Sequence, residues 1–239
     1  IALITIKWTL VVILFLILLA SLFFFQIKKQ QSEYHKNELQ VWASMKEGIT
    51  YIYRTKEILG ALCLDMFAVL FGGAVAMIPV FASDILKVGA DGFGLLNAAS
   101  DIGSMMIIVT LSFIPLRKNQ GKILIGVVAG FGLCIIGFGL SKLYWLSFLF
   151  LMLSGIFDGI SVVIRGTIVQ LKTPDHIRGR VMSANSIFIM SSNEMGQFES
   201  GVAAKLLGVV RSVVFGGTMT VLIALFVGKF VPKLRKMEY

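Results

Sequence analysis

The sequence predicts an all-α, polytopic membrane protein with about seven transmembrane helices, and three observations support this fold class. Of its 239 residues, 57% are hydrophobic and only 15% are charged, which leaves too little polar surface for a soluble globule. The apolar residues lie in blocks of about 20, the length at which a helix crosses a hydrocarbon layer ~30 Å thick. The 24 glycines and 4 prolines are typical of packed membrane helices, in which small residues let backbones approach.

The first apolar block, about Ile1 to Ile27, is long enough for a complete crossing. It is too long and too weakly flanked for the apolar region of a cleaved signal peptide, and the chain opens with Ile instead of Met. We therefore expect the sequence to be a fragment whose beginning lies upstream.

A polar stretch over residues 28–57 follows the first block. Its apolar residues recur at helical spacing: Val41, Trp42, Met45, Ile49 and Ile52. One interpretation is a helix that lies on the membrane surface with its tryptophan among the headgroups. The other is an ordinary solvated linker helix, and periodicity alone does not separate the two.

Six further apolar blocks predict six more crossings. They cover about Ile58–Phe81, Phe93–Leu116, Lys122–Leu140, Tyr144–Val169, Val181–Leu207 and Ser212–Phe230. Gly72-Gly73 and Pro79 should interrupt the first of these helices, because proline lacks the N–H that the helix ladder needs. The GxxxG spacings at Gly126/Gly130 and Gly155/Gly159 are interpreted as close helix contacts.

Basic residues are distributed unevenly between the two sets of loops. The rich set holds Lys28, Lys29, Lys36, Lys46, Arg54, Lys56, Arg117, Lys118, Lys122, Lys172, Arg178, Arg180, Lys229, Lys233, Arg235 and Lys236, and the poor set little beyond Lys87, Lys142 and Arg211. The positive-inside rule places the rich side, and with it the C-terminus, in the cytoplasm. The net charge of +9 is thus assigned to contact with the anionic leaflet and not to nucleic acid, because the cations lie in short clusters.

Ionisable residues inside the crossings are the main functional signal, since a charge near the bilayer centre costs at least ~2.5–3.5 kcal/mol. Asp158 and Arg165 both lie in the fifth crossing, two helical turns and roughly 10 Å apart. At that distance they are not expected to form a simple intrahelical pair. We expect both to face one interior cavity and to find partners on other helices or in water.

Four more acids complete the set of candidate transport or proton-coupling residues. Glu194 lies in the middle of the sixth crossing, Glu199 is about 140° further round that helix, and Asp65 and Asp101 are expected nearer the ends of their crossings. Desolvation favours the protonated carboxyl, so a buried acid can load and release a proton as a cavity opens to either side. The alternative is a buried polar network that only fixes helix register.

No catalytic or metal-binding pattern is present. The sequence lacks GxSxG, HExxH, P-loop and Rossmann fingerprints, so we expect no enzyme activity. Cys63 and Cys134 lie in separate apolar blocks without ligand spacing, and His35 and His176 lie in loops, so no metal or other cofactor is expected. Five methionines, Met105, Met106, Met182, Met190 and Met195, are interpreted as membrane core in preference to an adaptable binding surface.

A family resemblance emerges in the segment GIFDGISVVIRGTIVQLKTPDHIRGRVMSANSIFIMSSNEMGQFESG, residues 155–201. It resembles the major facilitator superfamily, in particular the bacterial branch that includes the enterobactin exporter, and the likeness extends through residues 59–86 and 88–104. The resemblance implies twelve helices in two six-helix halves that rock about a central cavity. Residues 1–27 would then be the sixth helix, 28–57 a cytoplasmic linker with an amphipathic helix, 58–231 the C-terminal half and 232–239 a cytoplasmic tail.

The resemblance also implies two cytoplasmic gate loops. Arg117, Lys118, Gly121 and Lys122 match the basic loop of the second half, although its leading Asp is absent, and Arg178-Gly179-Arg180 match the next such loop. These arginines are expected to bind helix C-terminal carbonyls and acidic partners across the interface between the halves. The alternative is that they serve only to hold the loops in the cytoplasm.

The resulting expectation is a multi-pass transporter of the bacterial inner membrane that exports a small amphipathic metabolite, such as a siderophore or drug, in exchange for protons. Its expected partners are the substrate, protons, lipid and the missing N-terminal half. Two alternatives stay open: a lipid or lysophospholipid flippase of the same superfamily, and a non-transporting module that binds a partner through its basic face.

Overall fold

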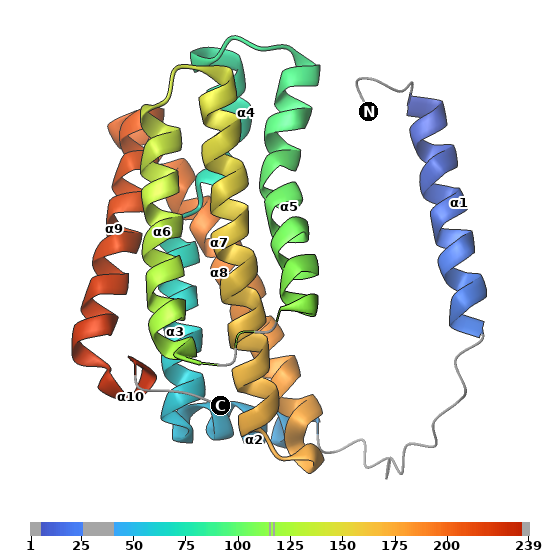
Figure 1. Cartoon of the computed structure of the whole chain (residues 1–239), viewed down its shortest axis with the longest axis vertical. Helices are drawn as coiled ribbons and strands as arrows, with labels where there is room; N and C mark the ends of the chain where they lie inside the picture. Colours follow the sequence, from blue (N-terminus) through green and yellow to red (C-terminus); the bar gives the residue numbers. More distant parts are fainter. Residues whose placement is uncertain (1–5, 26–40, 115, 117, 236–239) are drawn as a thin grey trace.

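The computed structural model describes residues 6–25, 41–114, 116 and 118–235, and this part of the chain is helical without any strand (Figure 1). The predicted all-α class is therefore confirmed. In chain order the elements are α1 (Ile6–Phe25), α2 (Val41–Arg54), α3 (Lys56–Phe71), η2 (Ala74–Met77), α4 (Ile78–Val80), η3 (Phe81–Ile85), α5 (Ala90–Phe113), α6 (Gln120–Leu140), α7 (Tyr144–Lys172), η4 (Asp175–Ile177), α8 (Arg178–Leu207), α9 (Val209–Phe230) and α10 (Pro232–Arg235).

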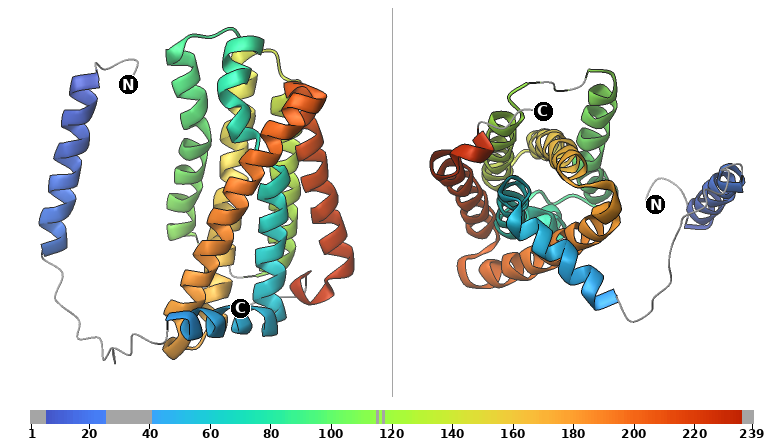
Figure 2. Two further views of the ribbon diagram at one scale, coloured as in Figure 1. Left: turned by 180° about the vertical axis from the view of Figure 1, so that it is seen from behind. Right: turned by 90° about the horizontal axis from the view of Figure 1, so that it is seen from below.

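Within the described residues, five helical stretches are long and apolar enough to cross a membrane. They are Lys56–Ile85, Ala90–Phe113, Gln120–Leu140, Tyr144–Lys172 and Val209–Phe230. The apolar stretch of α1, Leu10–Phe25, is shorter. Helix α8 has 30 residues and runs the length of the bundle (Figure 2), but its composition is too polar to qualify. Because polar side chains do not face hydrocarbon without cost, α8 is suited to face protein or water along much of its length.

The predicted interruption of the first bundle helix lies where the sequence placed it. Helix α3 ends at Phe71, and the N–H of Gly72 donates to the carbonyl of Ala68 at 2.7 Å. The chain continues through short helical segments in which Pro79 occupies the first turn of α4. At that position its missing N–H leaves no hydrogen bond unmade.

The six bundle helices form two successive triplets, α3–α5–α6 and α7–α8–α9. Each contact between the triplets has a counterpart in which the equivalent helices of the two triplets are interchanged. Helix α3 packs on α8, α5 packs on α7, and α6 packs on α9. The secondary contacts follow the same exchange, since α6 touches α7 and α3 touches α9. The chain direction of α3, α5 and α6 is opposite to that of α7, α8 and α9, respectively (Figure 1), so the bundle has the pattern of an inverted repeat.

Close packing between α5 and α7 depends on glycines. A Cβ added at Gly155 would lie 1.9 Å from the carbonyl oxygen of Ser100, and one at Gly103 would lie 2.0 Å from that of Met152. The hydroxyl of Ser104 donates to the carbonyl of Gly155 at 2.9 Å across the same contact. The GxxxG spacing that begins at Gly155 thus lies at a helix contact, as predicted. In the spacing that begins at Gly126, a Cβ added at Gly126 itself would meet nothing within 4 Å, so this first glycine is not at a close contact.

The amphipathic helix α2 lies across one end of the bundle (Figure 2). It packs against α8 and α3, with Ile52 fully buried and Ile49 beside the same core, while Trp42 is 81% exposed. The bundle thus covers Ile52 and part of Met45 and Ile49, and the choice between a membrane-surface helix and a solvated linker helix stays a prediction for its exposed side. Residues 26–40, with Lys28, Lys29, His35 and Lys36, lie outside the described residues.

Candidate functional site

A charged cluster joins α3 and α7 inside the bundle. The Nη1 of Arg165 is ion-paired with Oδ2 of Asp65, and its Nη2 lies 4.0 Å from Oδ1 of Asp158. The Nε of Arg165 also donates to the hydroxyl of Ser161 at 3.2 Å. Three of the six candidate residues, Asp65, Asp158 and Arg165, are therefore brought together, and the main partner of Arg165 comes from another helix, as expected.

The structure corrects two geometric expectations about this cluster. Arg165 does approach Asp158 on its own helix, because helical side chains lean toward the N-terminus and the long arginine side chain spans the intervening turns. Asp65 is not a peripheral residue of its helix: it lies well inside the Lys56–Ile85 stretch, and its carboxyl is buried. Ser161 was not predicted, although its position four residues before Arg165 is the spacing of helical neighbours.

The two carboxylates of the cluster differ in access. The side chain of Asp65 is 8% exposed and that of Asp158 is 44% exposed. Both line a small void of about 10 Å³, together with Ser161, Phe131 and other residues of α3, α6 and α7, which is room for roughly one water molecule. Arg165 therefore neutralises a buried carboxylate while a second carboxylate stays within reach of solvent or solute.

The remaining three acids do not join the cluster. Glu194 is exposed, about 200° around α8 from the buried Ser192 and Gly196, so it points away from the six-helix bundle. Asp101 is exposed in the same way near the middle of α5, and not near its end as expected, while Glu199 is half-buried. Within the described part of the chain, none of these three acids forms an ion pair.

The two arginines of the second predicted gate loop pair with acids of their own loop and of the linker helix. Arg178 pairs with Asp175 in its own loop, and Arg180 pairs with Glu47 of α2. The close contact of Gly48 with the Arg180 carbonyl, where an added Cβ would lie 2.6 Å away, holds α2 beside this loop. The acidic partners in the described structure therefore belong to the linker helix and the loop itself.

The other gate-loop residues make fewer contacts. Gly121 is buried, and an added Cβ would lie 1.8 Å from the Leu234 carbonyl oxygen, while Lys118, Lys122 and Gly179 are exposed. Arg117 lies outside the described residues. Gly121 is thus a close-packing position between α6 and α10, and the gate role of this loop stays a prediction.

We expect the Glu47–Arg180 pair to contribute only about 0.2–1 kcal/mol to folding, because both side chains are about half exposed. A double-mutant cycle with Glu47→Ala and Arg180→Ala, measured by unfolding in detergent, gives the coupling energy. The coupling should shrink further at high salt. A coupling above about 2 kcal/mol that salt does not change would contradict this prediction.

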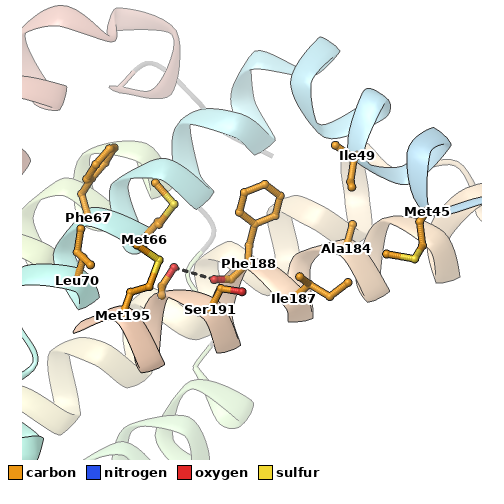
Figure 3. A pocket seen from close by; sticks show the side chains of 11 residues that line it. Met45, Ile49, Met66, Phe67, Leu70, Ala184, Ile187, Phe188, Ser191 and Met195 are labelled. Carbon is orange, nitrogen blue, oxygen red and sulfur yellow. Dashed lines mark hydrogen bonds between the residues drawn. The ribbon is translucent and has the colours of Figure 1, made fainter. Parts of the chain in front are cut away.

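An apolar pocket of about 420 Å³ lies between α2, α3 and α8 (Figure 3). Its lining residues are Met45, Ile49, Met66, Phe67, Leu70, Ala184, Ile187, Phe188, Ser191, Ser192 and Met195. Of the five methionines considered in the sequence, only Met195 lines it. Sequence reasoning missed the pocket because it forms where the linker helix meets the bundle, a contact that periodicity does not reveal.

The described residues contain no group of three or more His, Cys, Asp or Glu side chains that could hold a metal ion. The sequence matches the family described as Major Facilitator Superfamily over residues 1–197. No curated protein and no solved structure is matched. The family match covers most of the chain and agrees with the inverted pattern of helix contacts, so the chain belongs to the major facilitator superfamily of membrane transporters.

Proposed function

We propose that the chain is the C-terminal part of a proton-coupled exporter of a small amphipathic metabolite, such as a siderophore or drug, that works by alternating access in the bacterial inner membrane. The observation that carries the proposal is the Asp65–Arg165–Asp158 cluster within membrane-spanning helices. Residues 58–231 form the C-terminal half, residues 1–27 the preceding helix and 28–57 the linker. The basic loops and the C-terminal tail face the cytoplasm.

The cluster supports proton coupling through its unequal acids. Arg165 is already engaged by Asp65, so Asp158 is the more weakly held carboxylate and the one open to solvent. Protonation of Asp158 removes one negative charge from the site and changes its attraction for Arg165. Such a change in charge biases an alternating-access equilibrium when the two conformations expose the site to different sides of the membrane.

Glu194 supports the same proposal from a different position. Its exposed carboxylate lies on the face of α8 that does not pack on the six-helix bundle. In a complete transporter this face is directed toward the other half, where the substrate cavity of the superfamily lies. Because a carboxylate facing lipid would be costly, a wet interface is the environment that fits it.

We expect Glu194→Gln in the complete protein to abolish proton-driven efflux while sparing substrate binding. Efflux is measured in proteoliposomes with an imposed pH gradient, and binding is measured separately without a gradient. Ser186→Ala, an exposed change just over two turns away on the same helix, is the matched control and should keep both activities. Unchanged efflux by Glu194→Gln across the pH range would remove this residue from the mechanism.

A lipid or lysophospholipid flippase is the second candidate, and the apolar pocket between α2, α3 and α8 favours it. Its walls offer almost only hydrocarbon and thioether groups, which suit an acyl chain. Movement of a fluorescent lysophospholipid between leaflets, at equal rates with and without a proton gradient, would select this function over proton-coupled export.

A further inference from the structure

We propose that helix α2 is a permanent brace of the bundle, which holds α3 and α7 at a fixed offset and stays docked on them throughout the transport cycle. Asp65 and Arg165 are on these two helices, so the brace positions the charged cluster from outside it. The proposal rests on the proposed function, because it gives α2 a place in alternating access. It is carried by the attachments of α2 to α3, α7 and α8.

Helix α2 is joined to α3 by a tight corner of the chain. Only Thr55 separates the end of α2 at Arg54 from the start of α3 at Lys56. The N–H of Thr55 donates to the Tyr51 carbonyl at 3.0 Å, and its carbonyl accepts from the N–H of Leu59 at 3.0 Å. A single residue has only two soft backbone torsions, and the two helices also pack on each other. The corner therefore leaves α2 little freedom to move relative to α3.

Helix α2 is bonded to the end of α7. The hydroxyl of Tyr51 donates to the carbonyl of Lys172, the last residue of α7. Carbonyls in the last turn of a helix lack partners within that helix, so Tyr51 satisfies a group that α7 itself cannot. Arg165 lies about two turns from Lys172 on the same helix. Helix α2 thus holds, from one end of the bundle, both helices of the Asp65–Arg165 pair.

The backbone of α2 lies directly against the start of α8. Gly48 is buried, and an added Cβ would lie 2.6 Å from the Arg180 carbonyl oxygen and 3.2 Å from the Val181 nitrogen. Side chains that reach across a gap would not bring the two backbones this close. The ion pair between Glu47 and Arg180 lies beside the same contact. The attachment to α8 is therefore a packed contact with an ion pair at its edge.

An apolar core lies beneath α2. The side chain of Ile52 is fully buried, in one core cluster with Ile58 of α3, Ile168 of α7 and Val181 of α8. A latch held by polar contacts alone could open and close at each turnover. Release of α2 would instead expose Ile52 and the helix surfaces beneath it to water. The buried stripe therefore favours a helix that stays docked over one that is released.

The brace links the two helix triplets at this end of the bundle (Figure 2). Helix α3 belongs to the first triplet, α7 and α8 belong to the second, and α2 contacts all three. Separation of α3 from α7 at this end would break the attachments of α2 on one side or the other. Alternating access then moves this half as one rigid body, and the Asp65–Arg165 pair keeps its offset while the half rocks.

A cross-link between α2 and α8 tests whether the brace is permanent. In a background with Cys63→Ala and Cys134→Ala, Glu47→Cys and Arg180→Cys place two thiols where the ion pair stands, and a bifunctional maleimide of that length joins them. Efflux of ethidium, a small amphipathic drug, from proteoliposomes with an imposed pH gradient should match that of the unlinked protein. Each single cysteine, treated with the same reagent, is the control. Loss of efflux in the linked protein alone would overturn the proposal.

Ile52→Ala tests whether docking matters for transport. We expect efflux to fall about tenfold or more, because truncation of a buried isoleucine weakens the docked state by at least that factor. The cross-link should restore efflux to the level of the linked parent, which a general loss of packing would not allow. Trp42→Ala, an 81% exposed change on the same helix, should transport normally. A folded Ile52→Ala protein that transports normally without the link, or stays inactive with it, would contradict the proposal.

The docked state is also measured without transport. Spin labels at Lys46→Cys on α2 and Lys205→Cys near the far end of α8, in the same cysteine-free background, should give one distance, equal in acidic and alkaline buffer and with or without ethidium. A second distance would overturn the brace even where efflux is normal. One distance in a protein that does not move ethidium counts against the proposed export and not against the brace. This measurement and the cross-link decide the proposal if Ile52→Ala does not fold.

Discussion

Arg165→Met is expected to destabilise the folded protein by about 3–5 kcal/mol and to abolish transport. The substitution removes the guanidinium that pairs with Asp65 and donates to Ser161, while the Asp65 carboxylate stays buried. An uncompensated buried charge is far more costly than the loss of a pair in which both partners are removed. The measurement is an unfolding titration in mixed micelles, together with the yield of folded protein.

Two further variants distinguish the loss of charge balance from the loss of packing. Arg165→Met combined with Asp65→Leu replaces both charges with apolar groups and should recover most of the stability, because neither charge is left buried alone. Transport should not recover, since the cluster is gone. Asp158→Asn should cost much less stability, because that side chain is 44% exposed and is not the main partner of Arg165.

The double variant also gives the outcome that would contradict this account. If Arg165→Met alone is as stable as the unmodified protein, Asp65 is not buried as a carboxylate in the folded state. If the double variant stays as unstable as Arg165→Met, then shape and not charge balance determines the effect. In either case the cluster would not be the electrostatic centre of the bundle.

The helices of the bundle could be predicted from sequence because lipid imposes a length and a composition on them. Six apolar blocks after the linker correspond to α3 with its continuation, α5, α6, α7, α8 and α9. The break after Phe71 was predicted from Gly72-Gly73, but both glycines have ordinary negative φ. Their role is close packing, since an added Cβ would lie 2.6 Å from the Phe131 ring at Gly72 and 2.8 Å from the Gly196 carbonyl oxygen at Gly73. The sixth predicted crossing, Val181–Leu207, lies within helix α8, but α8 is too polar to be among the five described stretches that could cross a membrane by length and composition.

The partners within the site were less predictable, because they depend on helix rotation and on contacts distant in sequence. Asp65 and Arg165 are 100 positions apart, and only the packed arrangement of α3 and α7 brings them together. Glu194 and Glu199 lie on one helix, yet their surroundings differ according to which face packs on the bundle. The amphipathic pattern of α2 predicted a buried stripe without specifying whether lipid or protein covers it.

The second large effect is expected at Gly155, where α5 and α7 approach most closely. Gly155→Ala would place a Cβ about 1.9 Å from the Ser100 carbonyl oxygen, a backbone atom that cannot rotate away. The helices must separate, and the hydrogen bond from Ser104 to the Gly155 carbonyl weakens with them. We expect a loss of about 3 kcal/mol, at the upper end of the range for overpacked cores, and a fall in the midpoint of detergent unfolding.

Gly126→Ala is the matched control, since Gly126 also stands first in a GxxxG spacing on a membrane helix but an added Cβ meets nothing within 4 Å. This substitution should be neutral or should stabilise the helix by up to ~1 kcal/mol, because alanine has the higher helix propensity. Equal stability of the two variants would mean that α5 and α7 are not in close backbone contact. Because Asp158 and Arg165 are both on α7, a shift of this helix should also reduce efflux by Gly155→Ala, whereas Gly126→Ala should transport normally.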